Sequence, residues 1–252
     1  MKSKNLQDHI LAAYTNLRIG IGGLALILPF SLWAVGHSRS NLQLQDSISA
    51  YYHSGGGTTR DLFVGILCAI GAFLCLYKGY SLLEDWALNG AGIFLVGVAL
   101  FPMEWNCDTS CSKWSLHGTF AILFFLSIAY VCICLASDTL TPDLMKKEYD
   151  RKKYGRIYKL LGLAMIAIPL ITLLLTLIIP PGSGVRATIF WVETSGVVVF
   201  AVYWIVKSYE IYVTGTGKLA IEGKLISNQQ PSSDVFKWTP VQKVKGEDSS
   251  RR

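Results

Sequence analysis

"LHGTFAILFFLSIAYVCICLA", residues Leu116–Ala136, contains no lysine, arginine, aspartate or glutamate along its whole length. An α-helix rises about 1.5 Å per residue, so a helix of this length crosses the roughly 30 Å hydrocarbon core of a bilayer. The run therefore predicts a membrane-spanning helix.

Five further apolar runs approach the same length, and the composition of the whole chain agrees with them. Its 252 residues are 52% hydrophobic and 16% charged, with a mean hydropathy of +0.40. About a quarter of the residues of a soluble domain are charged. We therefore expect an all-α polytopic membrane protein with six transmembrane helices. The expected spans are Leu17–Gly36, Asp61–Tyr77, Ala87–Met103, Leu116–Ala136, Leu160–Ile179 and Ile189–Val206.

The basic residues predict how this bundle is oriented. With both termini on one side, nineteen of the 23 lysines and arginines fall on that side. Basic residues concentrate on the cytoplasmic side of membrane proteins, so both termini are expected inside. Residues 1–16 would be a cytoplasmic segment, 17–211 the membrane domain and 212–252 a largely disordered cytoplasmic tail. The net charge of +6 then reflects orientation, with the lipid bilayer as partner and no nucleic acid.

Two cysteines are expected outside the membrane, in the short sequence "CDTSC" between spans three and four. If that side is oxidising, Cys107 and Cys111 could form a disulfide. Free thiols and half of a metal site remain as alternatives, although a lone C-x3-C is weak evidence for a metal.

Several polar side chains are expected at the outer membrane level. Ser49 and His53 lie in "SISAYYHSGGGTTRD" (residues 47–61), and Asp61 begins span two. His117 begins span four, and Glu193 lies within span six. Ionisable groups at this depth are costly to expose to lipid, so they usually face the bundle interior and find partners. We expect them to converge on one polar site that is open to the outer face.

Two kinds of chemistry fit such a set. His53 and His117 could ligate zinc, which activates water, while Ser49, Asp61 and Glu193 supply catalytic groups. Alternatively, the same residues cap helices, pair with arginines and line a binding site without catalysis. "HSGGG" is similar to an oxyanion loop, but no G-x-S-x-G nucleophile motif accompanies it.

The blocks "SISAYYH", "RDLFVGILCAIGAFLCLYKGY", "LNGAG", "VALFP" and "LHGTFAILFF" resemble an uncharacterised family of bacterial multi-pass inner-membrane proteins. The resemblance covers about residues 45–210 and is most specific in "RDLFVG" and "YKGY". It implies a six-helix membrane fold in the cell inner membrane, and no established activity.

A fainter resemblance links the chain to the superfamily of alkaline ceramidases and adiponectin/progestin receptors. Those proteins place a serine, a histidine four residues later and an aspartate around zinc, and Ser49, His53 and Asp61 match that pattern. The superfamily also has paired histidines on its last helix. Span six of this chain has none, so Glu193 would have to substitute.

The sequence thus supports two hypotheses about function. The first is a membrane protein whose outer polar site binds a lipid or other ligand, senses or transports, without catalysis. The alternative is a metal-dependent hydrolase of a lipid amide or ester.

The orientation can be tested with reporter fusions. Because basic residues favour the cytoplasm, fusions after Lys78, Arg156 and Lys224 should report a cytoplasmic location. Fusions after Ser54, Ser112 and Ser183 should report an external one. A cytoplasmic signal at Ser54 would contradict the orientation and, with it, the outer site.

Overall fold

The computed structural model describes residues 2–104, 115–140, 148–179 and 187–221, and the regular structure in these residues is helical. Six of the helices are long and apolar enough to cross a membrane, which confirms the predicted number of spans. The helices are α1 (Lys2–Ser40), α2 (Thr58–Leu76), α3 (Leu82–Leu100), α4 (Leu116–Tyr130), α5 (Glu148–Ile178), α6 (Ala187–Thr214) and the short α7 (Thr216–Ile221). A π-helical segment (Val131–Leu135) and a 3-10 helix (Ala136–Thr139) continue α4, so the fourth span runs from Leu116 to Thr139.

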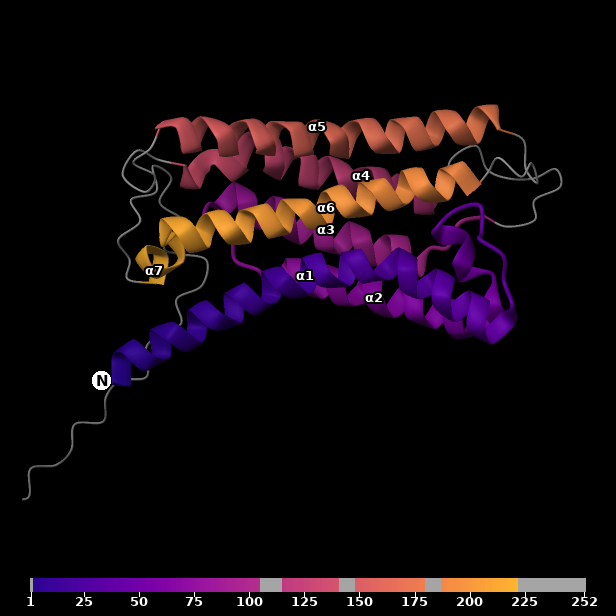
Figure 1. Ribbon diagram of the computed structural model, residues 1–252, viewed down its shortest axis with the longest axis horizontal. Helices are drawn as coiled ribbons and strands as arrows, with labels where there is room; N and C mark the ends of the chain where they lie inside the picture. The colour runs from indigo at the N-terminus through magenta and orange to yellow at the C-terminus, as the bar shows by residue number, and fades with distance from the viewer. Residues whose placement is uncertain (1, 105–114, 141–147, 180–186, 222–252) are drawn as a thin grey trace, which may run out of the picture.

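The six long helices form a closed ring. Each packs against its neighbour in sequence from α1 to α6, and α6 completes the ring by packing against α1. Figure 1 shows the helices side by side along the long axis of the molecule. One end, which we name the loop end, carries residues 41–57. The other, the α7 end, carries α7 and the first residues of α1.

Three helices extend at least eight residues beyond their predicted spans. The fifth, α5, begins at Glu148, twelve residues before Leu160. The first helix is continuous from Lys2, so the expected boundary after residue 16 falls inside α1. The last runs to Thr214, eight residues past Val206. Apolar residues resume after the charged residues of α6, and those charges find partners inside the bundle.

Cys107 and Cys111, the two cysteines of the predicted disulfide, lie outside the described residues.

Residues 41–57 connect α1 to α2 and fold back over the loop end. A short 3-10 helix spans Ser49–Tyr52, and three glycines then lead into α2. Gly55, Gly56 and Gly57 have φ angles of 76°, 65° and 96°, in a region where a side chain would clash with its own backbone. These glycines allow a sharp reversal that keeps Ser49 over the bundle while α2 begins only nine residues later.

The α7 end is closed by a tight turn between α2 and α3. Ser81 caps α3 by accepting a hydrogen bond from the Glu84 amide at 3.2 Å. The Glu84 carboxylate in turn accepts one from the Tyr80 amide at 2.7 Å. Such reciprocal capping satisfies amides that have no partner within the helix, and it fixes α2 and α3 as antiparallel neighbours.

Glycines allow α2 and α3 to touch backbone to backbone. A Cβ added to Gly92 would lie 2.5 Å from the carbonyl oxygen of Gly71, and one added to Gly71 would lie 2.8 Å from that of Gly92. Small residues at helix interfaces are the usual route to close packing in lipid. Close approach therefore explains these two glycines.

We expect Gly92→Val to separate α2 from α3 and to destabilise the protein by about 1–3 kcal/mol, the usual cost of overpacking. Gly65→Val is the matched control, since an added Cβ at Gly65 meets no atom within 4 Å. Thermal unfolding in detergent should show a lower midpoint for the first variant only. Equal midpoints would contradict the close approach.

Candidate functional site

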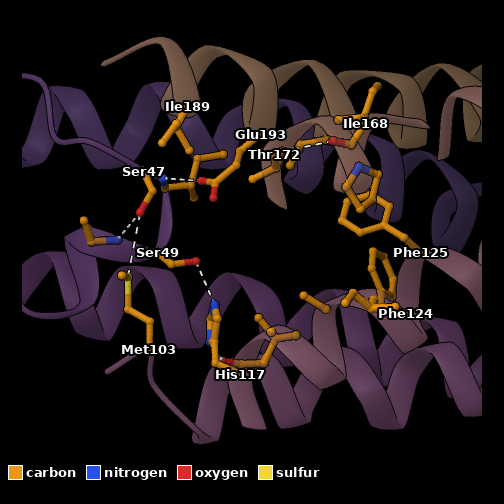
Figure 2. Close-up of a pocket in the computed structure, with 18 of the residues that line it drawn as sticks. Ser47, Ser49, Met103, His117, Phe124, Phe125, Ile168, Thr172, Ile189 and Glu193 are labelled. Carbon is orange, nitrogen blue, oxygen red and sulfur yellow. Dashed lines mark hydrogen bonds between the residues drawn. The ribbon is translucent and has the colours of Figure 1, made fainter. Parts of the chain in front are cut away.

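A cavity of about 360 Å³ lies inside the loop end of the bundle. All six long helices and residues 46–50 contribute to its wall. Its volume is within the roughly 300–1,000 Å³ range of small-molecule sites. Figure 2 shows the cavity with serines, His117 and Glu193 at one end and phenylalanines at the other.

At the polar end, Ser49 and His117 form a hydrogen bond. The Ser49 hydroxyl lies 2.9 Å from Nε2 of His117. On the other side of the ring, Nδ1 lies 3.1 Å from the Val98 carbonyl oxygen and 3.0 Å from that of Phe101. Carbonyl oxygens only accept, so Nδ1 carries the proton. Nε2 of the neutral ring is then an acceptor, and the Ser49 hydroxyl donates to it.

Glu193 closes the other side of the polar end. Its Oε2 accepts a hydrogen bond from the Ile48 amide at 2.7 Å, so α6 holds the backbone immediately before Ser49. The Ser47 hydroxyl accepts from the Ala50 amide at 3.0 Å and fixes the start of the 3-10 helix. Asp46 also lines the cavity. Among the residues that the structure describes, the lining of the polar end thus has two carboxyl groups and no lysine or arginine.

The remainder of the cavity is apolar and reaches the surface of the bundle. Phe124 and Phe125 of α4 and Ile168 of α5 form its far wall (Figure 2). Ile122 of α4 and Leu173 of α5 line the cavity and are 40% and 47% exposed. Exposed residues of both α4 and α5 therefore line the cavity on the side where these two helices meet, a face that contacts acyl chains when the helices span a bilayer.

The structure brings together three of the five predicted site residues. Ser49, His117 and Glu193 all line the cavity. His53 lies at its rim: its Nε2 is 2.8 Å from the carbonyl oxygen of Met103, and it is not part of the lining.

Asp61 does not join the site. Its side chain is 73% exposed and pairs with Arg60 at 3.2 Å. A carboxylate in the first turn of α2 is stabilised by the partial positive charge of the helix N-terminus and needs no partner inside the bundle. The expected convergence therefore fails at this residue.

The residues at the polar end do not fit zinc. Within the described part of the chain, no three histidine, cysteine, aspartate or glutamate side chains come close enough to share an ion. Zinc sites in proteins usually have three or four such ligands. Both ring nitrogens of His117 and Nε2 of His53 already have protein partners.

A second polar cluster, not predicted from the sequence, lies at the α7 end of the bundle. Lys207 and Glu210, which are 1% and 0% exposed, form an ion pair at 2.9 Å. Lys207 also donates to the Ala136 carbonyl oxygen at 2.8 Å and to the Thr139 hydroxyl at 2.7 Å. The Tyr158 hydroxyl donates to Glu210 at 2.8 Å. This cluster joins α5 and α6 to the 3-10 helix Ala136–Thr139 that follows α4.

The sequence did contain a signal for this cluster. The predicted sixth span ends at Val206, so Lys207 and Glu210 fell just outside it. Ile211 and Val213 resume the apolar pattern after Glu210, and a lysine three residues before a glutamate lies on the same helix face. These features indicate a longer helix with an internal ion pair.

The fold and the cavity define a multi-pass membrane protein with a chamber inside its helical bundle. The family model described as "Protein of unknown function (DUF998)" matches residues 21–207. The chain belongs to this family, as the sequence blocks led us to expect for an uncharacterised membrane family. No curated protein and no solved structure matches the chain.

Removing one member of the buried ion pair should be costly. Lys207→Met leaves Glu210 without its cation, and such losses cost about 3–5 kcal/mol. The double variant Lys207→Met/Glu210→Met removes both charges and should recover much of that loss. Chemical unfolding in detergent measures the stability of the unmodified protein, of Lys207→Met and of the double variant. A double variant that is as unstable as Lys207→Met, or less stable, would contradict the coupling.

Proposed function

We propose that this protein binds one amphiphilic molecule in the cavity, with the polar group of the ligand at Ser49 and His117 and its chain against Phe124 and Phe125. The observation that carries the proposal is the shape of the chamber. One end has hydrogen-bonding groups, the body is apolar, and exposed residues of α4 and α5 line it on the side that faces lipid. An amphiphile can enter from the bilayer without exposing its chain to water.

The charges at the polar end favour a particular class of headgroup. Asp46 and Glu193 line this end. Among the described residues, the lining offers an anionic head no lysine or arginine as a partner, and a charge buried without a partner is costly. We infer that the ligand is a neutral or cationic single-chain lipid whose head donates hydrogen bonds.

The basic residues add a direction to this proposal. The excess of lysine and arginine at the α7 end favours a cytoplasmic location for that end, so the chamber would open to the outer leaflet. A metal-dependent hydrolase is the weaker alternative, since the donor groups around the cavity do not fit zinc. Binding requires only the chamber itself.

Photocrosslinking tests this proposal. The purified protein, in lipid nanodiscs, is irradiated with a monoacylglycerol analogue that carries a diazirine in its chain. We expect labelled peptides from α4 and α5 around the cavity. Ala121→Trp places an indole in the lining and should reduce labelling at least about tenfold, a loss of about 1.4 kcal/mol in binding.

The matched control is Leu123→Trp, two residues along the same helix and outside the cavity lining. It should label like the unmodified protein. Excess monooleoylglycerol should compete with the probe more strongly than oleate does, because oleate is anionic. Equal labelling of both tryptophan variants would overturn the site, and stronger competition by oleate would overturn the assigned headgroup.

A further inference from the structure

Ser49 and His117 have the arrangement of an activated nucleophile and its base. The hydroxyl oxygen and Nε2 are 2.9 Å apart, within the range for direct proton transfer between such groups. Ser49 lies in the cavity wall, so its oxygen can meet a bound molecule. His117 is only 8% exposed and lines the cavity, so its ring meets the cavity and the protein rather than bulk water.

Two backbone carbonyls hold the histidine in the tautomer that this chemistry needs. In Ser-His-Asp enzymes, a carboxylate accepts from Nδ1–H and leaves Nε2 free to take the serine proton. Here the Val98 and Phe101 carbonyl oxygens accept from Nδ1 at 3.1 and 3.0 Å. They lie at the C-terminal end of α3, where helix carbonyls have no partner within the helix.

The serine is also held in place on both sides. The Ile48 amide, immediately before it, donates to Glu193, and the Ala50 amide, immediately after it, donates to the Ser47 hydroxyl. Ser49 lines the cavity, so the hydroxyl that bonds His117 is also placed to meet a bound molecule.

We propose that Ser49 and His117 are a metal-independent nucleophile and base that cleave the ester bond of a long-chain acyl lipid with a neutral or cationic alcohol. The proposal rests on the binding function above and assigns a reaction to the same cavity. The acyl chain lies in the apolar body, the carbonyl carbon meets the Ser49 hydroxyl, and the alcohol lies toward Asp46 and Glu193.

The steps balance without a cofactor. The Ser49 oxygen forms a bond to the acyl carbon while its proton moves to Nε2 of His117. The carbon–oxygen bond to the alcohol then breaks, and the alcohol leaves with that proton. A water molecule next attacks the acyl-serine and gives a proton to Nε2. Release of the fatty acid returns this proton to Ser49, so one ester and one water give one acid and one alcohol.

A long-chain alkyl fluorophosphonate tests the nucleophile directly, because it phosphonylates an activated serine and loses fluoride. Mass spectrometry of the nanodisc-embedded protein should find the adduct on Ser49. Ser49→Ala should abolish it. His117→Ala should slow its formation about 100-fold or more, the usual contribution of a general base. Hydrolysis of monooleoylglycerol should fall in the same variants.

Ser54→Ala is the control, since this serine bonds Gln45 and the Ala50 carbonyl in the same loop but lies outside the lining. It should retain the adduct and the hydrolysis. The Ser49→Cys variant should lose the fluorophosphonate adduct and instead react with a long-chain reagent that is specific for thiols. That second reaction would show that the loop is still folded.

The outcomes separate the two proposals. Photocrosslinking in the cavity without an adduct on Ser49 would overturn the reaction and leave binding in place. An adduct that persists unchanged in His117→Ala would overturn the role of the base. Absence of crosslinking by the monoacylglycerol probe would overturn the binding function and, with it, this reaction.

Discussion

A polar group that is buried among membrane helices must find its partner within the protein, because the surrounding lipid offers none. This constraint organises both ends of the bundle. At the α7 end, Lys207 and Glu210 are almost fully buried and bond each other, Thr139 and Tyr158. At the loop end, the same need brings Glu193 to a backbone amide of the first loop.

The buried polar groups find their partners in different ways at the two ends, and this difference distinguishes a structural cluster from a candidate binding site. The α7 cluster is closed: within it, both charged side chains are almost fully buried and bond to protein groups. At the loop end, the hydrogen-bonded groups line a chamber of about 360 Å³. A closed cluster fixes how helices pack, whereas polar groups that face a cavity can also meet a ligand.

The first loop depends on helices that are distant from it in sequence. Residues 47–53 are held by His117 of α4, by Glu193 of α6 and by the Met103 carbonyl after α3. Ring closure between α1 and α6 brings these anchors to one end of the bundle. The loop in turn covers the chamber, so the site exists only when the complete ring has formed.

The sequence by itself determined the class of fold, since long apolar runs have only one favourable arrangement in lipid. It also identified Ser49, His117 and Glu193 as candidates, because polar groups at membrane depth need partners. The tertiary structure decided which partners they have. It paired Ser49 with His117, although Ser49-x3-His53 is the closer spacing in sequence, and it left Asp61 exposed beside Arg60. It also extended α6 to include Lys207 and Glu210. Such pairings depend on which helix faces meet across the ring, and hydrophobicity along a single chain does not encode that choice.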